Sequence, residues 1–425
     1  MVKDRARNIH NLEMKNGHNL CKLVNTLYEK SSFYKSKFDE IGLHPEDIKG
    51  VEDLHRLPFT EKGDLRHNYP LGMQVAPEDE IVRIHSSSGT TGKPVLIPYT
   101  KGDVDNWTIM MARCMEMVGI TSGDRLQITP GYGLWTAGTG FQAGAEYIGA
   151  MALPIGPGNT EQQLKFMVDL KTTVLIGTSS YGLLLAEEAE KRGLLGDVSL
   201  RIGILGSERW GEKMRARIES LFGMKTFDIY GLTEIYGPGI AIDCPSHSGL
   251  HYWNDHFIFE IIDPLTGGPV ENGNKGELVI TTLTKEGMPL LRYRTRDITR
   301  ILPARCSCGS AYPMIDRIIG RSDDMIKVKG VQVYPADIEQ IITTLSDISS
   351  EYLIKIDRQG GRENITLEVE RNQRAKSTNN TLAVLLQEEI KKKIGISFSV
   401  RVVEFGSLPR SQKKTKRIID SRELQ

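Results

Sequence analysis

The chain has 425 residues, more than a single hydrophobic core usually organises, so we expect two or three domains. Lys and Arg together number 54, as do Asp and Glu, and this balance gives no argument for a nucleic-acid or membrane partner. The polar start "MVKDRARNIHNLEMKNG" is unlike a signal peptide, no apolar run approaches the roughly 20 residues of a membrane helix, and five cysteines give no disulfide framework. We therefore expect a soluble cytoplasmic protein.

Helices are expected first, followed by alternating strands and helices. Residues 1–80 are predicted to be mostly helical, with an amphipathic run from Leu20 to Phe38. From about residue 80, short apolar runs such as "TTVLIGT", "RIGILGS" and "KTFDIYGLTE" end in Gly, Ser or Thr and are separated by helical stretches. This alternation predicts an α/β fold with a largely parallel sheet. The later runs "HFIFEIID", "GELVITTL" and "ITRIL" follow one another without helices and predict a β-rich subdomain.

A domain boundary is expected near residue 320, at the polar sequence "GRSDD". Beyond it, strand-like runs and two helical stretches are typical of a small α+β domain. We therefore expect a large N-terminal α/β domain over residues 1–320, with parallel sheets and the β-rich subdomain, and a small C-terminal domain over residues 321–425.

The turn between the strand-like runs "EIVRIH" and "PVLIPYT" is rich in hydroxyl groups and glycine. It is not a Walker P-loop, because Ser87 and Pro94 stand where that motif requires Gly and Ser or Thr. Hydroxyls, backbone N–H groups and a lysine can nevertheless bind phosphate oxygens. The alternative is a flexible hairpin loop. The predicted phosphate-binding residues are Ser86, Ser87, Ser88, Gly89, Thr90, Thr91, Gly92 and Lys93.

Five motifs in family order resemble those of the adenylate-forming superfamily of acyl-CoA synthetases, synthetase adenylation domains and luciferases. "SSSGTTGKP" is similar to its phosphate loop, "YGLTE" to its adenine and magnesium motif, and "YRTRD" to its ribose motif. "GRSDDMIKVKGVQVYPADIE" resembles its hinge and small-domain strand, and "LPRSQKKTKR" its terminal catalytic-lysine motif. "YPLGM", "GLHYWNDHF" and "TLTKEGMPLLRYRTRD" further resemble the phenylacetate–coenzyme A ligase branch. The resemblance covers nearly the whole chain.

The resemblance implies an ATP-dependent aryl acid–CoA ligase with two half-reactions. A carboxylate attacks the α-phosphorus of ATP to give an acyl-adenylate and pyrophosphate, and the coenzyme A thiol then displaces AMP. The expected partners are ATP, Mg²⁺, coenzyme A and an aryl carboxylic acid; a homodimer stays open. One alternative is an enzyme that adenylates another acid or a cofactor without coenzyme A. The other is a nucleotide-binding regulatory protein with a degenerate site.

Single residues acquire roles through the same resemblance. Lys414 would be the catalytic lysine, although Lys413 stands where the family has Gly. Thr233 would hydrogen-bond the α-phosphate and Glu234 would bind Mg²⁺. Asp297 would accept from the ribose hydroxyls, and the small domain would swing about Asp323 between two poses. The remaining nucleotide-binding residues would be Gly206, Ser207, Glu208, Asp228, Tyr230, Gly231 and Arg321.

The segment "GYGLWTAGTGF" resembles the family's acyl-pocket segment, and "YGPG" would close the pocket. Its aromatic residues would form a slot and its glycines would leave room for a ring, although aromatic residues also occur in cores. An arylacetate, a benzoate or indoleacetate would fit this description. The expected pocket residues are Tyr132, Trp135, Gly138, Phe141, Tyr236, Gly237 and Pro238.

A zinc site is expected from two short segments, "DCPSHSGLH" and "RCSCGS". Three thiolates and one imidazole suit tetrahedral zinc. We expect Cys244, His251, Cys306 and Cys308 to bind it, with His247 as the alternative imidazole. A pair of free cytosolic thiols is the competing interpretation of the Cys-x-Cys sequence. Because nothing places this cluster at the chemistry, its role would be structural.

Overall fold

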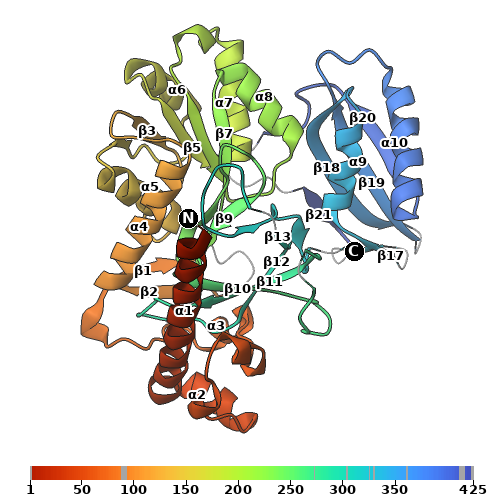
Figure 1. Cartoon of the computed structure of the whole chain (residues 1–425). Helices are drawn as coiled ribbons and strands as arrows, with labels where there is room; N and C mark the ends of the chain where they lie inside the picture. Colours follow the sequence, from red (N-terminus) through yellow and green to blue (C-terminus); the bar gives the residue numbers. More distant parts are fainter. Residues whose placement is uncertain are drawn as a thin grey trace. The chain divides into compact units, whose positions relative to one another are not determined.

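The computed structural model describes residues 2–87, 93–271, 273–302, 305–324, 326–328, 331–359, 362–410 and 417–422. The chain divides into two compact units, and Figure 1 labels their helices and strands. The first consists of Met1–Gly156 and Phe227–Ile318, and the second of Pro157–Thr226 and Ile319–Gln425. The division at residue 318 lies close to the expected domain boundary, which stays a prediction. No helix among the described residues is both long and apolar enough to span a bilayer.

The first unit begins with helices, as predicted. The side chain of Ser31 accepts from the backbone N–H of Tyr34 and caps α2, and Thr100 with Asp103 forms a capping box at the start of α4. The α-helices of this unit are α1 (Val2–Lys30), α2 (Ser32–Glu40), α3 (Lys62–His67), α4 (Lys101–Met117) and α5 (Thr136–Tyr147). The 3-10 turns are Pro45–Asp47, Val51–Arg56 and Glu78–Glu80.

The strands of the first unit form one parallel pair and several antiparallel sheets. The parallel pair is β3 (Arg125–Ile128) with β4 (Met151–Leu153). The antiparallel hairpin is β1 (Ile81–Ser86) with β2 (Leu96–Thr100). The next antiparallel series runs β7 (Lys225–Leu232), β8 (Gly237–Ile242), β9 (Leu250–Tyr252), β14 (Met314–Ile315) and β13 (Ile301–Leu302). The last consists of β10 (Phe257–Ile262), β11 (Gly276–Thr282) and β12 (Tyr293–Thr299), which confirms the β-rich subdomain.

The second unit contains a parallel strand pair with helices after each strand. Its core comes from apolar side chains of the helices α6, α7 and α8, with Leu175 of β5 and Leu205 of β6. Strand–helix alternation of this kind was expected from the apolar runs that end in Gly, Ser or Thr. The elements are α6 (Thr160–Asp169), β5 (Val174–Thr178), α7 (Ser179–Lys191), the 3-10 turn Leu195–Asp197, β6 (Ile202–Gly206) and α8 (Glu212–Phe222).

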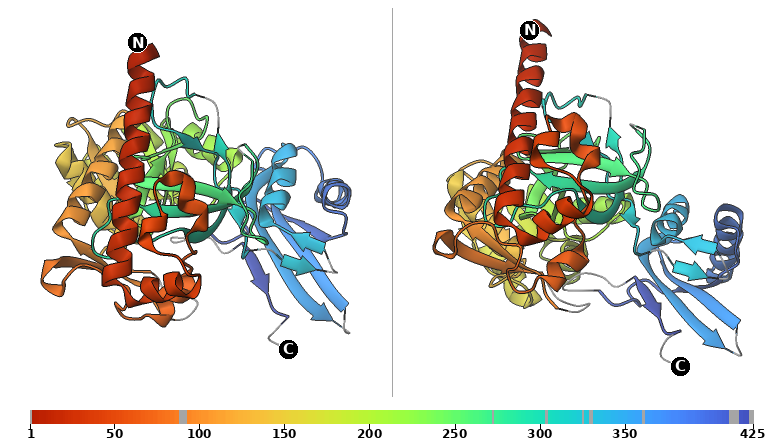
Figure 2. Two further views of the ribbon diagram at one scale, coloured as in Figure 1. Left: turned by 60° about the horizontal axis from the view of Figure 1, so that its bottom comes forward. Right: turned by 90° about the horizontal axis from the view of Figure 1, so that it is seen from below.

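The C-terminal part of this unit is the predicted small α+β domain. Its main sheet has the order β20-β19-β18-β21, and α9 and α10 lie on one face of it (Figures 1 and 2). Isoleucine, leucine and valine side chains from the sheet and both helices form its core. The elements are β15 (Gly320–Arg321), β16 (Ile326–Val328), β17 (Val331–Val333), α9 (Pro335–Thr344), β18 (Ile348–Gln359), β19 (Arg362–Arg371), α10 (Asn379–Ile394), β20 (Ser399–Val403) and β21 (Ile418–Asp420).

Candidate active site

A hydrogen bond joins the adenine motif to the ribose motif in the first unit. The Tyr230 hydroxyl on β7 donates to Oδ2 of Asp297 on β12 across 2.6 Å. Both residues are nearly buried, at 9% and 8% exposure. The two motifs lie 67 residues apart in the sequence, so only the fold brings them together. A carboxylate oriented by a tyrosine hydroxyl is a suitable acceptor for a diol.

Glu234 lies in the turn that follows β7, four residues after Tyr230 in the sequence. It is only 5% exposed, and the Lys62 ammonium at the start of α3 lies 2.9 Å from its Oε1. Thr233, its neighbour, is half-buried. Sequence reasoning missed Lys62, because a single lysine at a helix start forms no recognisable pattern.

Lys285 contacts the turn that contains Glu234. Its ammonium donates to the Ile235 carbonyl at 2.5 Å and lies 4.1 Å and 4.2 Å from the ring centroids of Tyr99 and Tyr236. Burial lowers the pKa of this ammonium to about 8. The two rings stabilise the cation through their negative faces. Lys285 therefore fixes the backbone of the residue next to Glu234, a role that the sequence did not predict.

The structure describes the two strands that flank the phosphate turn, but not residues 88–92 of the turn itself. Ser87 closes the hairpin, since its N–H donates to the Val95 carbonyl and its Oγ accepts from the Val95 N–H, each at 2.9 Å. The Ser86 hydroxyl donates to the Ser87 carbonyl, and the exposed Lys93 lies over the Tyr69 ring. The predicted residues Ser88, Gly89, Thr90, Thr91, Gly92 and Lys414 lie outside the described residues.

Two of the expected acyl-pocket residues, Gly237 and Pro238, lie against Trp107 of α4, which sequence reasoning did not include. A Cβ on Gly140 or Gly237 would lie 2.3 Å or 2.8 Å from the Trp107 ring, so glycine is required at both positions. Its indole Nε1 donates to the Pro238 carbonyl at 2.8 Å. Phe141 and Tyr236 are buried, Gly138 is covered by the Tyr132 ring, and Trp135 is half exposed.

His85 forms an aromatic cluster with Tyr99 and Trp107. Its ring packs edge-on against Tyr99 and Trp107, with centroid distances of 5.2 Å and 5.6 Å. Burial lowers the pKa of its imidazole to about 4, so it is neutral at pH 7. Nδ1 lies 3.2 Å from the Leu134 carbonyl, and Nε2 has no polar partner among the described residues. The histidine therefore links the phosphate turn to the acyl-pocket segment.

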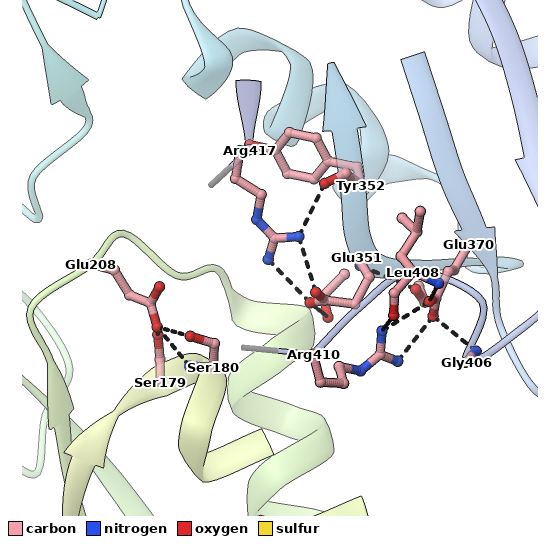
Figure 3. Close-up of polar contacts among 12 residues, drawn as sticks. Ser179, Ser180, Glu208, Glu351, Tyr352, Glu370, Gly406, Leu408, Arg410 and Arg417 are labelled. Atoms are coloured by element: carbon pink, nitrogen blue, oxygen red, sulfur yellow. Dashed lines mark hydrogen bonds and ion pairs between the residues drawn. The ribbon is translucent and has the colours of Figure 1, made fainter. Parts of the chain in front are cut away.

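In the second unit, Glu208 is held by the first residues of α7. Its Oε1 accepts from the Ser179 hydroxyl at 3.1 Å, the Ser180 N–H at 2.7 Å and the Ser180 hydroxyl (Figure 3). It follows Gly206, the last residue of β6, and Ser207, whose φ is +65°. A positive φ is uncommon for serine and often marks a functional turn.

The expected hinge carries an internal ion pair. Arg321 donates to both carboxylate oxygens of Asp323, with distances of 2.8 Å and 3.0 Å. Both side chains are solvent-exposed, so this pair contributes little to stability. Two further expected nucleotide-binding residues lie on β7 in the first unit: Asp228, which is half-buried, and Gly231.

The four expected zinc ligands come together in the first unit. Their ligand atoms all lie within 4.8 Å of one another. The sulfurs of Cys244 and Cys306 are 3.4 Å apart, and Cys308 Sγ lies 3.3 Å from His251 Nε2. Because His251 Nδ1 lies 2.8 Å from the Tyr312 carbonyl, that nitrogen carries the proton and Nε2 offers its lone pair to the cysteines.

The alternative ligand His247 does not belong to this cluster. Its Nδ1 lies 2.6 Å from Asp243 Oδ2, and its ring stacks on Phe227 at a centroid distance of 5.4 Å. The structure therefore favours His251 over His247, a choice that the sequence left open.

Comparisons with known proteins agree with this arrangement. Residues 22–284 match the family described as AMP-binding enzyme, and residues 330–422 match the AMP-binding enzyme C-terminal domain. Phenylacetate-coenzyme A ligase of Aromatoleum evansii is 42% identical over 94% of this chain and 92% of the relative. The enzyme of that name from Escherichia coli (strain K12) is 41% identical over 93% of this chain and 92% of the relative.

A solved structure extends the similarity to the fold. The 2-hydroxyisobutyryl-CoA ligase in its postadenylation state matches with a TM-score of 0.86 and 27% identity, covering 96% of this chain and 89% of that one. The α/β fold and the C-terminal domain are shared. The chain therefore belongs to the AMP-binding enzyme family and, within it, to the family of the phenylacetate–coenzyme A ligases.

Proposed function

We propose that this protein is an ATP-dependent aryl acid–CoA ligase that forms an acyl-adenylate and then an acyl-CoA thioester. The observation that carries the proposal is the hydrogen bond between Tyr230 and Asp297, which joins the expected adenine and ribose motifs although they are 67 residues apart in the sequence. The two ligases at about 40% identity support the same reaction class. AMP and pyrophosphate would be the other products.

The nucleotide would be held by charge and by hydrogen bonds. Asp297 would accept from the ribose hydroxyls, and Tyr230 would keep that carboxylate in place. Glu208, fixed by the two serines of α7, would border the adenine. The phosphate turn would hold the β- and γ-phosphates, and Lys414 would stabilise the charge that develops at the α-phosphorus. Arg321 would contact the nucleotide.

Magnesium would bind at Glu234, with Thr233 on the α-phosphate. A nearly buried carboxylate suits a hard cation that also takes phosphate oxygens as ligands. The cation would neutralise phosphate charge. The Lys62 ammonium, 2.9 Å from Oε1 of the same carboxylate, would add positive charge next to the phosphates.

The acid would lie against the aromatic cluster around Trp107. Glycines at positions 140 and 237 bring the backbone close to this ring and leave no side chain in the way. His85, neutral and buried, adds no charge that would favour a second carboxylate on the acid. These features support a monocarboxylic aryl acid, and phenylacetate is the first acid to test because the two relatives bear its name.

The cluster of three cysteines and His251 would hold a structural zinc ion. Three soft thiolates and one imidazole lone pair are a donor set that zinc prefers. The ligands join β9 and the turn at residues 306–308 to the segment after β8. Zinc would therefore crosslink parts of the chain about 60 residues apart and contribute to folding rather than to the reaction.

The domain boundary near residue 320 and the hinge at Asp323 stay part of the proposal. The small domain would use one pose for adenylation and a second for thioester formation. The exposed Arg321–Asp323 pair adds little resistance to such a movement.

The proposal is tested by acid-dependent exchange of labelled pyrophosphate into ATP, measured across a panel of arylacetates, benzoates and indoleacetate. An acid that supports exchange should also give a thioester when coenzyme A is added. Exchange without any thioester would identify an enzyme that adenylates without coenzyme A. No exchange with any acid would favour the regulatory alternative. Asp297→Asn should weaken ATP binding in the exchange assay.

A further inference from the structure

Two partly buried arginines belong to the terminal lysine motif. Arg410 precedes residues 411–416 and Arg417 follows them. Arg417 donates to both carboxylate oxygens of Glu351 at 3.0 Å and 3.1 Å, and its guanidinium lies over the Tyr352 ring (Figure 3). These contacts lie wholly within the small domain. Arg417 therefore anchors the far end of the motif to β18.

Arg410 anchors the N-terminal side of the motif through contacts with β19 and α7. Its two terminal nitrogens donate to the two oxygens of Glu370 at 2.8 Å and 2.9 Å. Glu370 is fully buried and also accepts from the N–H groups of Gly406 and Leu408. The third nitrogen of Arg410, Nε, donates to Oε2 of Glu187 on α7 at 2.9 Å. One guanidinium thus joins β19 of the small domain to α7.

The pair between Arg410 and Glu187 is well shielded from solvent. The two side chains are 10% and 18% exposed, so their attraction is screened less than that of a surface pair. Burial raises the pKa of the Glu187 carboxyl, whereas the contact with Arg410 opposes that change. Loss of the Arg410 contact would therefore raise the pKa of the Glu187 carboxyl further.

Helix α7 also carries the residues that hold Glu208, the adenine-pocket candidate. Ser179 and Ser180 lie at its first turn, eight and seven residues before Glu187, a distance of roughly 10 Å along the helix. Arg410 is therefore docked on the helix that positions part of the nucleotide site. Lys414 follows Arg410 by four residues.

A second contact holds the small domain to α8. The Lys213 ammonium donates to the carbonyl groups of Ile342, Leu345 and Ile348 at 2.9 Å, 2.5 Å and 2.7 Å. These carbonyls come from the end of α9 and the start of β18, where helix carbonyls lack intrahelical donors. Lys213 and Glu187 thus dock the small domain on two neighbouring helices.

We propose that Arg410 is a positioning residue for the adenylation half-reaction, and that its ion pair with Glu187 seats the terminal lysine motif on α7 in that pose. This inference rests on the proposed function. The pair breaks when the small domain turns to the thioester-forming pose, while Arg410 stays bound to Glu370. Loss of the pair should therefore slow adenylation and leave thioester formation intact.

The test compares Glu187→Gln with Glu188→Gln in the full-length protein. Both changes remove one carboxylate from adjacent positions of α7, but among the described residues the ion-pair partners of Glu188 are Lys191 and Arg192 of the same segment. Adenylation is measured as acid-dependent pyrophosphate exchange, and the second half-reaction as thioester formation from pre-made phenylacetyl-AMP and coenzyme A. Thermal melting verifies that each variant is folded. Lys213→Met, which removes the other docking contact, provides an independent second variant.

Glu187→Gln should lower kcat of exchange by about 10-fold, the equivalent of about 1.4 kcal/mol. The KM values for ATP and acid should stay within about 2-fold, and the rate of thioester formation should not fall, because a positioning residue affects one pose. Glu188→Gln should change neither rate. Lys213→Met, like Glu187→Gln, should slow pyrophosphate exchange and leave thioester formation unchanged. Equal loss of both half-reactions, or no loss, in folded Glu187→Gln would overturn the positioning role. If none of the acids in the panel supports pyrophosphate exchange by the wild-type protein, the proposed function itself is refuted.

Discussion

Lys285 makes the stability of the fold depend on pH in a way that can be calculated. Burial lowers the pKa of its ammonium from 10.5 to about 8. Between these two values the unfolded chain binds more protons than the folded protein, so the stability that depends on this group rises with pH across that window. Replacing Lys285 by Met keeps an unbranched apolar side chain and removes the titrating group.

The size of the effect follows from the two pKa values. From pH 7 to about pH 9.5, the free energy of unfolding of the wild type should increase by about 2 kcal/mol relative to that of Lys285→Met. Urea unfolding followed by tryptophan fluorescence at several pH values gives this difference. The other titrating groups are common to both proteins and largely cancel. Lys285→Arg stays charged over the whole range and should show the same slope against the wild type.

A difference in unfolding free energy that stays constant with pH would refute this reasoning. It would mean that Lys285 is hydrated or paired in solution and does not form the buried contact with Ile235, Tyr99 and Tyr236. Lys285→Met should also slow pyrophosphate exchange, because the Ile235 carbonyl beside Glu234 loses its donor.

Four further predictions concern the motifs and the metal. Tyr230→Phe should raise the KM for ATP by about 10-fold, since a hydrogen bond to a charged group contributes about 1.5–3 kcal/mol; steady-state exchange kinetics measure it. Lys414→Ala should slow adenylation by about 100-fold or more while thioester formation from phenylacetyl-AMP continues, and normal exchange in this variant would contradict the assignment. Asp323→Pro fixes φ at the hinge and should alter the two half-reactions unequally in the same assays. Elemental analysis should find about one zinc per chain; Cys306→Ser should lose it and lower the melting temperature, whereas His247→Ala should keep it.

Much of the fold was predictable because local patterns carry it. Short apolar runs that end in Gly, Ser or Thr predicted β5, β6 and β7, and the helical stretches expected between such runs are α7 and α8. The apolar runs "HFIFEIID" and "GELVITTL" predicted β10 and β11, whereas "ITRIL" covers only the end of β12 and then β13, which pairs with β14. In each case the periodicity and the turn residues lie within a few positions of one another, so tertiary contacts are not needed to recognise the element.

The candidate site was only partly predictable. Motif residues such as Asp297 and Tyr230 were recognised, but the hydrogen bond between them depends on how two distant strands are placed. No sequence motif surrounds Lys62, Lys285 or Glu187. Their roles follow from the residues that the fold places next to them, which are Glu234, Ile235 and Arg410. The choice between the two candidate zinc-binding histidines likewise required the structure.

The most direct test of the proposed function is a product analysis of the wild-type protein. The protein is incubated with ATP, Mg²⁺ and phenylacetate, with and without coenzyme A, and all products are quantified by chromatography and mass spectrometry. The proposed function predicts AMP and phenylacetyl-CoA in equal amounts when coenzyme A is present, and little net AMP when it is absent. Formation of ADP, release of AMP without dependence on the acid, or absence of a thioester with every aryl acid of the panel would contradict it.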